Sequence, residues 1–134
     1  QDLEQIKIYS HTNIIVIDGN KVKELNIDNY RLMVDADAMI SDYSSSGTDF
    51  LHTGRPIAYT LDDLTEYRLG FIVENPKDLM PGMKIYCFND LIDFFELLNN
   101  GTDEYYNQRK LILNRMFTFH DGNSCSRLAE HIGL

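Results

Sequence analysis

The order of apolar and polar residues along this sequence predicts short buried strands that alternate with amphipathic helices. The clearest strand is Asn13–Asp18 (NIIVID), in which four consecutive β-branched apolar residues precede an Asp-Gly-Asn turn. Shorter apolar segments bounded by turn residues are also predicted as strands, at 38–41, 56–61, 70–73 and 84–88.

Helical patterns fill most of the remaining sequence. A helix over 46–53 is expected to stop at Gly54 and Pro56. From Asn89, the expected N-cap, the chain is helical to its end, and the first of these helices carries an apolar stripe of Leu91, Ile92, Phe95 and Leu98. The full set of predicted helices is a weak one at 1–10, then 29–36, 46–53, a turn at 63–67, 89–99, 102–119 and 123–132.

Strands alternating with helices predict a parallel sheet with helices on both faces. The expected fold class is therefore α/β, with a Rossmann-like three-layer α/β/α architecture. In such folds the ligand binds beyond the carboxyl ends of the strands. No repeat, low-complexity tract or linker-like stretch divides the sequence, so a single domain over 1–134 is expected.

Composition and charge exclude several classes of partner. The chain has 134 residues, with 12 Lys and Arg against 21 Asp and Glu, which gives a net charge of −9. So acidic a surface repels phosphodiester backbones, which argues against nucleic-acid binding. No apolar run reaches the roughly 20 residues of a membrane-spanning helix, so no transmembrane segment is predicted.

The ends and the cysteines indicate the setting. The sequence lacks an initiator Met and a signal peptide, so we expect a piece of a longer protein. Cys87 and Cys125 make neither a disulfide framework nor a metal cluster, which favours a reducing, cytoplasmic setting.

The segment 37–50 (DAMISDYSSSGTDF) carries the clearest chemistry. A predicted strand ends at Ser41, a turn dense in hydroxyl groups follows, and a helix begins. The first turn of a helix offers backbone N–H groups and a partial positive charge to an anion. Small residues let the anion approach closely, so Ser44–Thr48 are expected to cradle a phosphate without a lysine.

A purely structural interpretation of the same residues stays open. Ser46 and Asp49 have the spacing of a capping box, so the serines could simply cap the helix. Asp42, placed just beyond the strand, could either face a ligand or accept hydrogen bonds from the amides of its own turn.

Other phosphate and metal motifs are absent from the sequence. There is neither G-x-x-x-x-G-K-[ST] nor G-x-G-x-x-G, which argues against kinases, ATPases and dinucleotide oxidoreductases. Asp35 and Asp37 precede a strand whose far end bears Asp42 and Asp49, so these carboxylates should not converge. No protein metal site and no cofactor are predicted, although Mg²⁺ could accompany a diphosphate.

The stretch DADAMISDYSSSGTDFLHTGRPIAY resembles the bacterial CDP-glycerol glycerophosphotransferase family, the polymerases and primases of teichoic-acid-type chains. Later segments follow the family's order, namely D-x-x-x-Y, R-G-F, P-G and a late D-G-x-[AS]. The resemblance implies a GT-B fold of two Rossmann-like domains. It further implies that this chain is the later part of the donor-binding domain, with the N-terminal acceptor domain absent.

The resemblance also implies a set of donor-binding residues. The D-Y-S-S-x-x-x-D positions are expected to contact the CDP-glycerol diphosphate or to structure its loop, and an E-Y-R block lies near the donor. The Arg68 guanidinium could pair with phosphate in a bidentate manner, or form a surface salt bridge instead. The candidate donor-binding residues are Asp42, Ser44, Ser45, Ser46, Gly47, Asp49, Glu66, Tyr67 and Arg68.

No catalytic residue is predicted in this chain, because the histidines on which the family relies lie upstream of it. Its own His11, His52, His120 and His131 are expected on the surface or in turns. The implied activity of the parent protein is transfer of glycerol phosphate from CDP-glycerol to a lipid-linked or glycan acceptor, building a teichoic-acid-like or capsular polymer. The parent would be peripheral on the inner face of the cell membrane, and the isolated chain would bind nucleotide weakly without turnover.

Two departures from the family pattern keep the donor open. The spacing from Tyr67 to Gly70 is short, and Gly47-Thr48 replace a bulkier apolar pair. The alternatives are another GT-B transferase that uses a nucleotide sugar or a different CDP-alditol, and a non-enzymatic α/β binding module.

Overall fold

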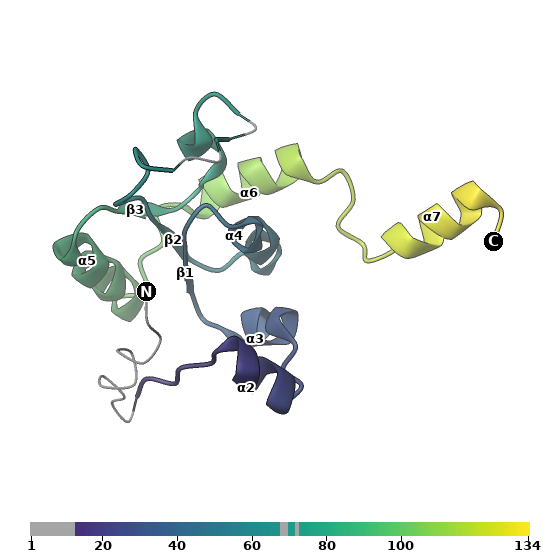
Figure 1. Ribbon diagram of the computed structural model, residues 1–134. Coiled ribbons are helices and arrows are strands. Elements are labelled where there is room, and N and C mark those ends of the chain that lie inside the picture. Colours follow the sequence, from purple (N-terminus) through teal and green to yellow (C-terminus); the bar gives the residue numbers. More distant parts are fainter. Residues whose placement is uncertain (1–12, 68–69, 72) are drawn as a thin grey trace. The chain divides into compact units, whose positions relative to one another are not determined.

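The computed structural model describes residues 13–67, 70–71 and 73–134, and the chain forms two compact units that divide between Asp35 and Ala36 (Figure 1). The first unit contains α2 (Gly19–Glu24) and α3 (Asn29–Asp35). The Asp18 carboxylate caps α2 by accepting hydrogen bonds from the amides of Asn20 and Lys21 at 3.0 and 2.8 Å. The helix predicted at 29–36 is confirmed by α3.

The strand predicted at Asn13–Asp18 is wrong. Residues 14–18 have no regular structure, and Ile15 is 80% exposed. A β-strand is stable only when its backbone groups pair with a neighbouring strand, and the described sheet pairs none of these residues. The β-branched residues therefore have the propensity for a strand, but no strand of the described sheet pairs with them. The weak helix expected at 1–10 lies outside the described residues.

The second unit is built on a parallel sheet in the order β1-β2-β3. Its strands are β1 (Met39–Ser41), β2 (Ile57–Thr60) and β3 (Met83–Ile85), and Ile40, Ala58 and Met83 lie side by side in register. This sheet confirms the α/β class and the parallel arrangement that the alternating pattern predicts.

The helical elements of the second unit are α4 (Ser45–Phe50), the 3₁₀ turns η2 (Leu51–Thr53) and η3 (Pro76–Leu79), α5 (Phe88–Asn99), α6 (Tyr106–Met116) and α7 (Ser124–Ile132). Of these, α5 packs against β3 on one face of the sheet and α4 against β1 on the other, while α6 packs against η2 (Figure 1). As predicted, the helix over 46–53 ends at Gly54, which adopts the left-handed conformation with φ 70°.

The two faces of β2 explain this layering, since successive side chains of a strand point to opposite faces. Ala58 packs with Phe94 of α5 and Ile85 of β3 in one core cluster. Tyr59 points the other way, against Gly47 of α4. The short central strand is therefore buried from both faces.

The apolar stripe predicted for α5 is partly wrong. Phe94 is the buried residue, with Leu91 and Leu98 packed beside it, whereas Ile92 and Phe95 are 40% and 52% exposed. When Phe94 is at the centre of the buried face of the helix, Phe95 lies at the edge of that face and Ile92 lies on the opposite side.

Several predicted boundaries also shift. The N-cap of α5 is Cys87 rather than Asn89, and the Asp90 carboxylate accepts hydrogen bonds from the amides of Tyr86 and Cys87 there. The strand predicted at 84–88 is accordingly shorter, since β3 ends at Ile85. The helix predicted at 102–119 covers only Tyr106–Met116. The small strand expected at 70–73 is not formed by the residues described there. In the described part of the chain, no helix combines the length and apolar character needed to cross a membrane.

Candidate functional site

The residues predicted as a phosphate cradle, Ser44–Thr48, lie at the carboxyl end of β1, where Ser44 precedes α4 and Ser45–Thr48 begin it. We call the bend after β1 and the first two residues of α4 the serine turn (Asp42–Ser46). Side chains of this segment accept hydrogen bonds from its own backbone amides. The Asp42 carboxylate accepts a hydrogen bond from the Ser44 amide at 2.8 Å. The Ser44 hydroxyl oxygen accepts from the amide and the hydroxyl of Ser46 at 3.3 and 2.8 Å. Ser44 is therefore the N-cap of α4.

These contacts correct the capping-box prediction and leave a donor available. Because α4 begins at Ser45, Ser46 lies inside the helix and does not form a capping box with Asp49. Asp42 behaves as a turn residue, one of the two roles left open for it. Whichever hydroxyl of the Ser44–Ser46 pair donates to the other, the remaining hydroxyl keeps a proton that it can donate elsewhere.

The serine hydroxyls are accessible, as a phosphate site requires. Ser44 and Ser45 are exposed and Ser46 is half-buried. Gly47, by contrast, is buried because α4 rests on the sheet there: a Cβ at this position would lie 3.2 Å from the Tyr59 ring and 3.3 Å from the Ser41 hydroxyl. Gly47 thus seats the helix start on β1 and β2, whereas Asp49 lies half-buried in the second turn of α4.

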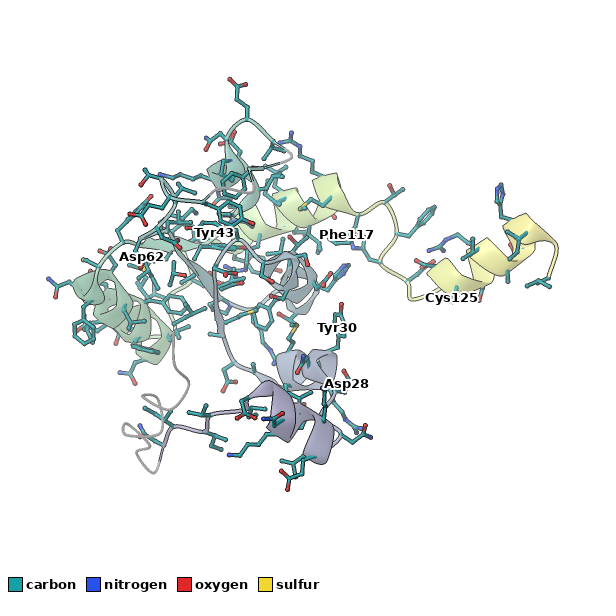
Figure 2. All side chains as sticks on the ribbon, viewed as in Figure 1. Asp28, Tyr30, Tyr43, Asp62, Phe117 and Cys125 are labelled. Carbon is teal, nitrogen blue, oxygen red and sulfur yellow. The ribbon has the colours of Figure 1, made fainter. Side chains whose placement is uncertain are left out.

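A second predicted block lies beside the serine turn. The segment 62–67, which follows β2, forms a turn in which the Glu66 amide donates to the Asp63 carbonyl at 2.9 Å. Tyr43 and Asp62 lie at the same end of the sheet (Figure 2). The Tyr43 and Tyr67 ring centroids are 4.7 Å apart. The structure thus brings Tyr67 to the serine turn, with Glu66 exposed next to it, while Arg68 lies outside the described residues.

Tyr43 is the residue of this region that sequence reasoning missed. Its ring also lies 5.5 Å from that of Phe71, and its hydroxyl donates a hydrogen bond to the Asp63 carboxylate. Burial and, as the smaller cause, the hydrogen bond to Asp63 raise the pKa of the Tyr43 hydroxyl above that of an ordinary tyrosine. Its position between Asp42 and Ser44 was the available signal.

A pocket of about 290 Å³ opens further along the same edge of the sheet, at the carboxyl ends of β2 and β3. Its lining combines aromatic and aliphatic side chains with a few polar groups: Thr60, Asp62, Ile85, Tyr86, Cys87, Phe88 and Leu91. Thr60 also ties the edge together, because its hydroxyl donates to the Ser41 carbonyl at 3.3 Å. The serine turn, the 62–67 turn and this pocket therefore share one edge, where parallel α/β sheets bind ligands.

Two histidines meet elsewhere in the unit. The His52 ring lies 4.4 Å from Phe117 and 5.6 Å from His120. Among the described residues, the ring contacts of His52 and His120 are with each other and with Phe117, and none joins them to the serine turn. Among the residues that the structure describes, no three His, Cys, Asp or Glu side chains are grouped to hold a metal ion.

Comparison with known proteins identifies the family of this chain. The sequence profile of the family described as CDP-Glycerol:Poly(glycerophosphate) glycerophosphotransferase matches residues 3–134. This chain belongs to that family. The family resemblance drawn from the D-Y-S-S block is thereby confirmed.

Two curated relatives of this family member are similar over most of the chain. One is a teichoic acid glycerol-phosphate transferase of Staphylococcus aureus, 30% identical over 72% of this chain and 25% of the relative. The other is a teichoic acid glycerol-phosphate primase of Bacillus subtilis, 30% identical over 80% of this chain and 28% of the relative. The chain thus spans about a quarter of the length of these relatives. No solved structure matches it.

Proposed function

We propose that this chain is the donor-binding part of a transferase that moves glycerol phosphate from CDP-glycerol to a lipid-linked or glycan acceptor. The observation that carries the proposal is the family match over residues 3–134, which includes the serine turn at the carboxyl edge of the sheet. The whole enzyme would have a GT-B fold, with the acceptor domain outside this chain, and would build a teichoic-acid-like or capsular polymer at the inner face of the membrane.

In this proposal the serine turn binds the donor diphosphate. The remaining hydroxyl proton of the Ser44–Ser46 pair, the exposed Ser45 hydroxyl and the first backbone amides of α4 would donate hydrogen bonds to phosphate oxygens. The half-buried Ser46 and the seated Gly47 would keep the turn in shape. Asp42 and Asp49 would support the loop rather than touch the anion, because carboxylates repel phosphate. Glu66, Tyr67 and Arg68 would lie along the donor.

The chemistry then divides between this chain and the rest of the enzyme. An acceptor hydroxyl oxygen attacks the phosphorus that bears glycerol, the bond from that phosphorus to the bridging oxygen breaks, and CMP leaves. Hydrogen-bond donors fixed around the diphosphate stabilise charge that develops on the leaving group. The base that takes the acceptor proton would come from outside this chain, and Mg²⁺ could accompany the diphosphate.

Calorimetric titration of the full-length protein with CDP-glycerol, CDP and a UDP-sugar tests the proposal. We expect saturable binding of CDP-glycerol and CDP, and at least about tenfold weaker binding after Ser45→Ala, because one hydrogen bond to a charged phosphate is lost. Ser126→Ala, on an exposed position of α7, serves as the matched control and should bind like the wild type.

Each other outcome points to a different function. Preference for the UDP-sugar would favour a nucleotide-sugar transferase. Absence of nucleotide binding by the full-length protein would favour a non-enzymatic α/β module. Equal affinity of Ser45→Ala and the wild type would mean that the diphosphate binds elsewhere than at the serine turn.

A further inference from the structure

Tyr43 lies in the middle of the serine turn, yet its side chain leaves that turn. Its ring packs against Tyr67 at 4.7 Å and against the edge of Phe71 at 5.5 Å, and Tyr67 and Phe71 stack on each other at 4.9 Å. The three rings come from the segments that follow two neighbouring strands, β1 and β2. They form an aromatic cluster that joins the serine turn to the 62–67 turn, and their centroid distances are those of favourable aromatic pairs.

The Tyr43 hydroxyl makes a second connection between the same segments. It donates to the Asp63 carboxylate, and the Asp63 carbonyl accepts the Glu66 amide at 2.9 Å. One side chain of the serine turn therefore holds both the aromatic residue and the backbone turn of the predicted E-Y-R block. Asp63, Asp62 and Asp42 are the charged groups that act on the Tyr43 hydroxyl.

This connection matters because the second segment is acidic. Asp62, Asp63 and Glu66 are exposed side chains beside a turn that, in the proposed function, holds a diphosphate. Like charges repel, so the segment would move away from a bound donor unless something holds it. Ring packing and a hydrogen bond to a carboxylate are contacts that offset such repulsion at close range.

We propose that Tyr43 is a positioning residue that clamps the 62–67 turn against the serine turn, so that Glu66 and Tyr67 lie beside the bound donor. The inference rests on the proposed function for the identity of the donor. The clamp itself is a property of the protein without ligand. The two can therefore be tested separately.

Amide hydrogen exchange on the ligand-free, full-length protein tests the clamp. In Tyr43→Phe the ring stays and only the hydroxyl is lost, so we expect the Glu66 amide to exchange about fivefold faster, while the core amide of Ala58 in β2 is unchanged. Asp63→Ala should match this result. Asp63→Asn keeps an acceptor oxygen and should stay within about twofold of the wild type. Tyr106→Phe on α6 is the matched control and should change neither amide.

Donor binding by the same variants tests the role in function. We expect Tyr43→Phe to weaken CDP-glycerol binding by about fivefold. Asp63→Ala should weaken it less, because it also removes a charge that repels the diphosphate, and adding Tyr43→Phe to Asp63→Ala should cause no further loss. In turnover, the loss should appear mainly in KM. Unchanged exchange at Glu66 in Tyr43→Phe, or unchanged donor affinity in a wild-type protein that does bind, would overturn the clamp alone. Failure of the wild type to bind any CDP compound would overturn the proposed function and the clamp's role in it together.

Discussion

At the scale of single residues, Gly82 occupies a position where a neighbouring backbone leaves no room for a side chain. A Cβ on Gly82 would lie 2.0 Å from the carbonyl oxygen of Ile57, the first residue of β2. Such a distance is far inside van der Waals contact, and the atom it meets is backbone, which cannot swing aside. Gly82 therefore allows the segment before β3 to approach the start of β2 closely.

We predict that Gly82→Ala destabilises the fold by roughly 1–3 kcal/mol, the usual cost of overpacking. Urea denaturation followed by circular dichroism would measure this as a lower midpoint with an unchanged slope. Gly19→Ala is the matched control, because nothing lies within 4 Å of a Cβ at that helical position. Equal midpoints for the two variants would contradict the argument.

At the scale of elements, one buried arginine fixes α6. Arg109 is only 2% exposed, and its guanidinium pairs with both carboxylate oxygens of Asp103. The same group donates to the Gly54 carbonyl at 3.0 Å, which ties α6 to the loop between η2 and β2. Within the described residues, Asp103 and Gly54 bond the two terminal nitrogens of the guanidinium, whereas its Nε is buried without a hydrogen-bond partner.

We predict that Asp103→Ala costs about 3 kcal/mol of unfolding free energy, because it leaves a buried charge without its counterion. Replacing both partners, as in Asp103→Ala with Arg109→Met, should recover part of this loss, since no charge is then buried. Chemical denaturation of the two variants measures the difference. A double variant less stable than Asp103→Ala would contradict this account of the pair.

At the scale of the whole molecule, the candidate site lies at one edge of a small sheet. The three strands are parallel, and the turns that follow β1 and β2 carry the groups proposed to bind the donor. The chain nonetheless covers only about a quarter of the length of its curated relatives. Binding and turnover should therefore separate.

We predict that this chain by itself binds CDP-glycerol but releases no CMP when a lipid-linked glycerol phosphate acceptor is added. The full-length protein should release CMP under the same conditions, because it would bring the acceptor and the base to the bound donor. Chromatographic measurement of CMP distinguishes the two cases. Release by the chain alone would mean that it contains its own base.

The sequence by itself determined the features that depend on local chemistry. The serine-rich stretch after a short apolar strand predicted the turn and the helix that follow β1, and Gly54 predicted where that helix ends. The alternation of strands and helices predicted the parallel α/β sheet. Each of these follows from neighbours in the chain, through capping, turn conformation and periodicity.

Only the tertiary structure decided the features that depend on distant partners. Asn13–Asp18 has the propensity of a strand, but pairing decides whether a strand forms, and the described sheet does not include it. Packing against β2 and β3 chose Phe94 over Phe95 as the buried residue of α5. The contact of Tyr43 with Asp63 and Tyr67 spans about twenty residues, and no local pattern reports which side chains two adjacent strands bring together.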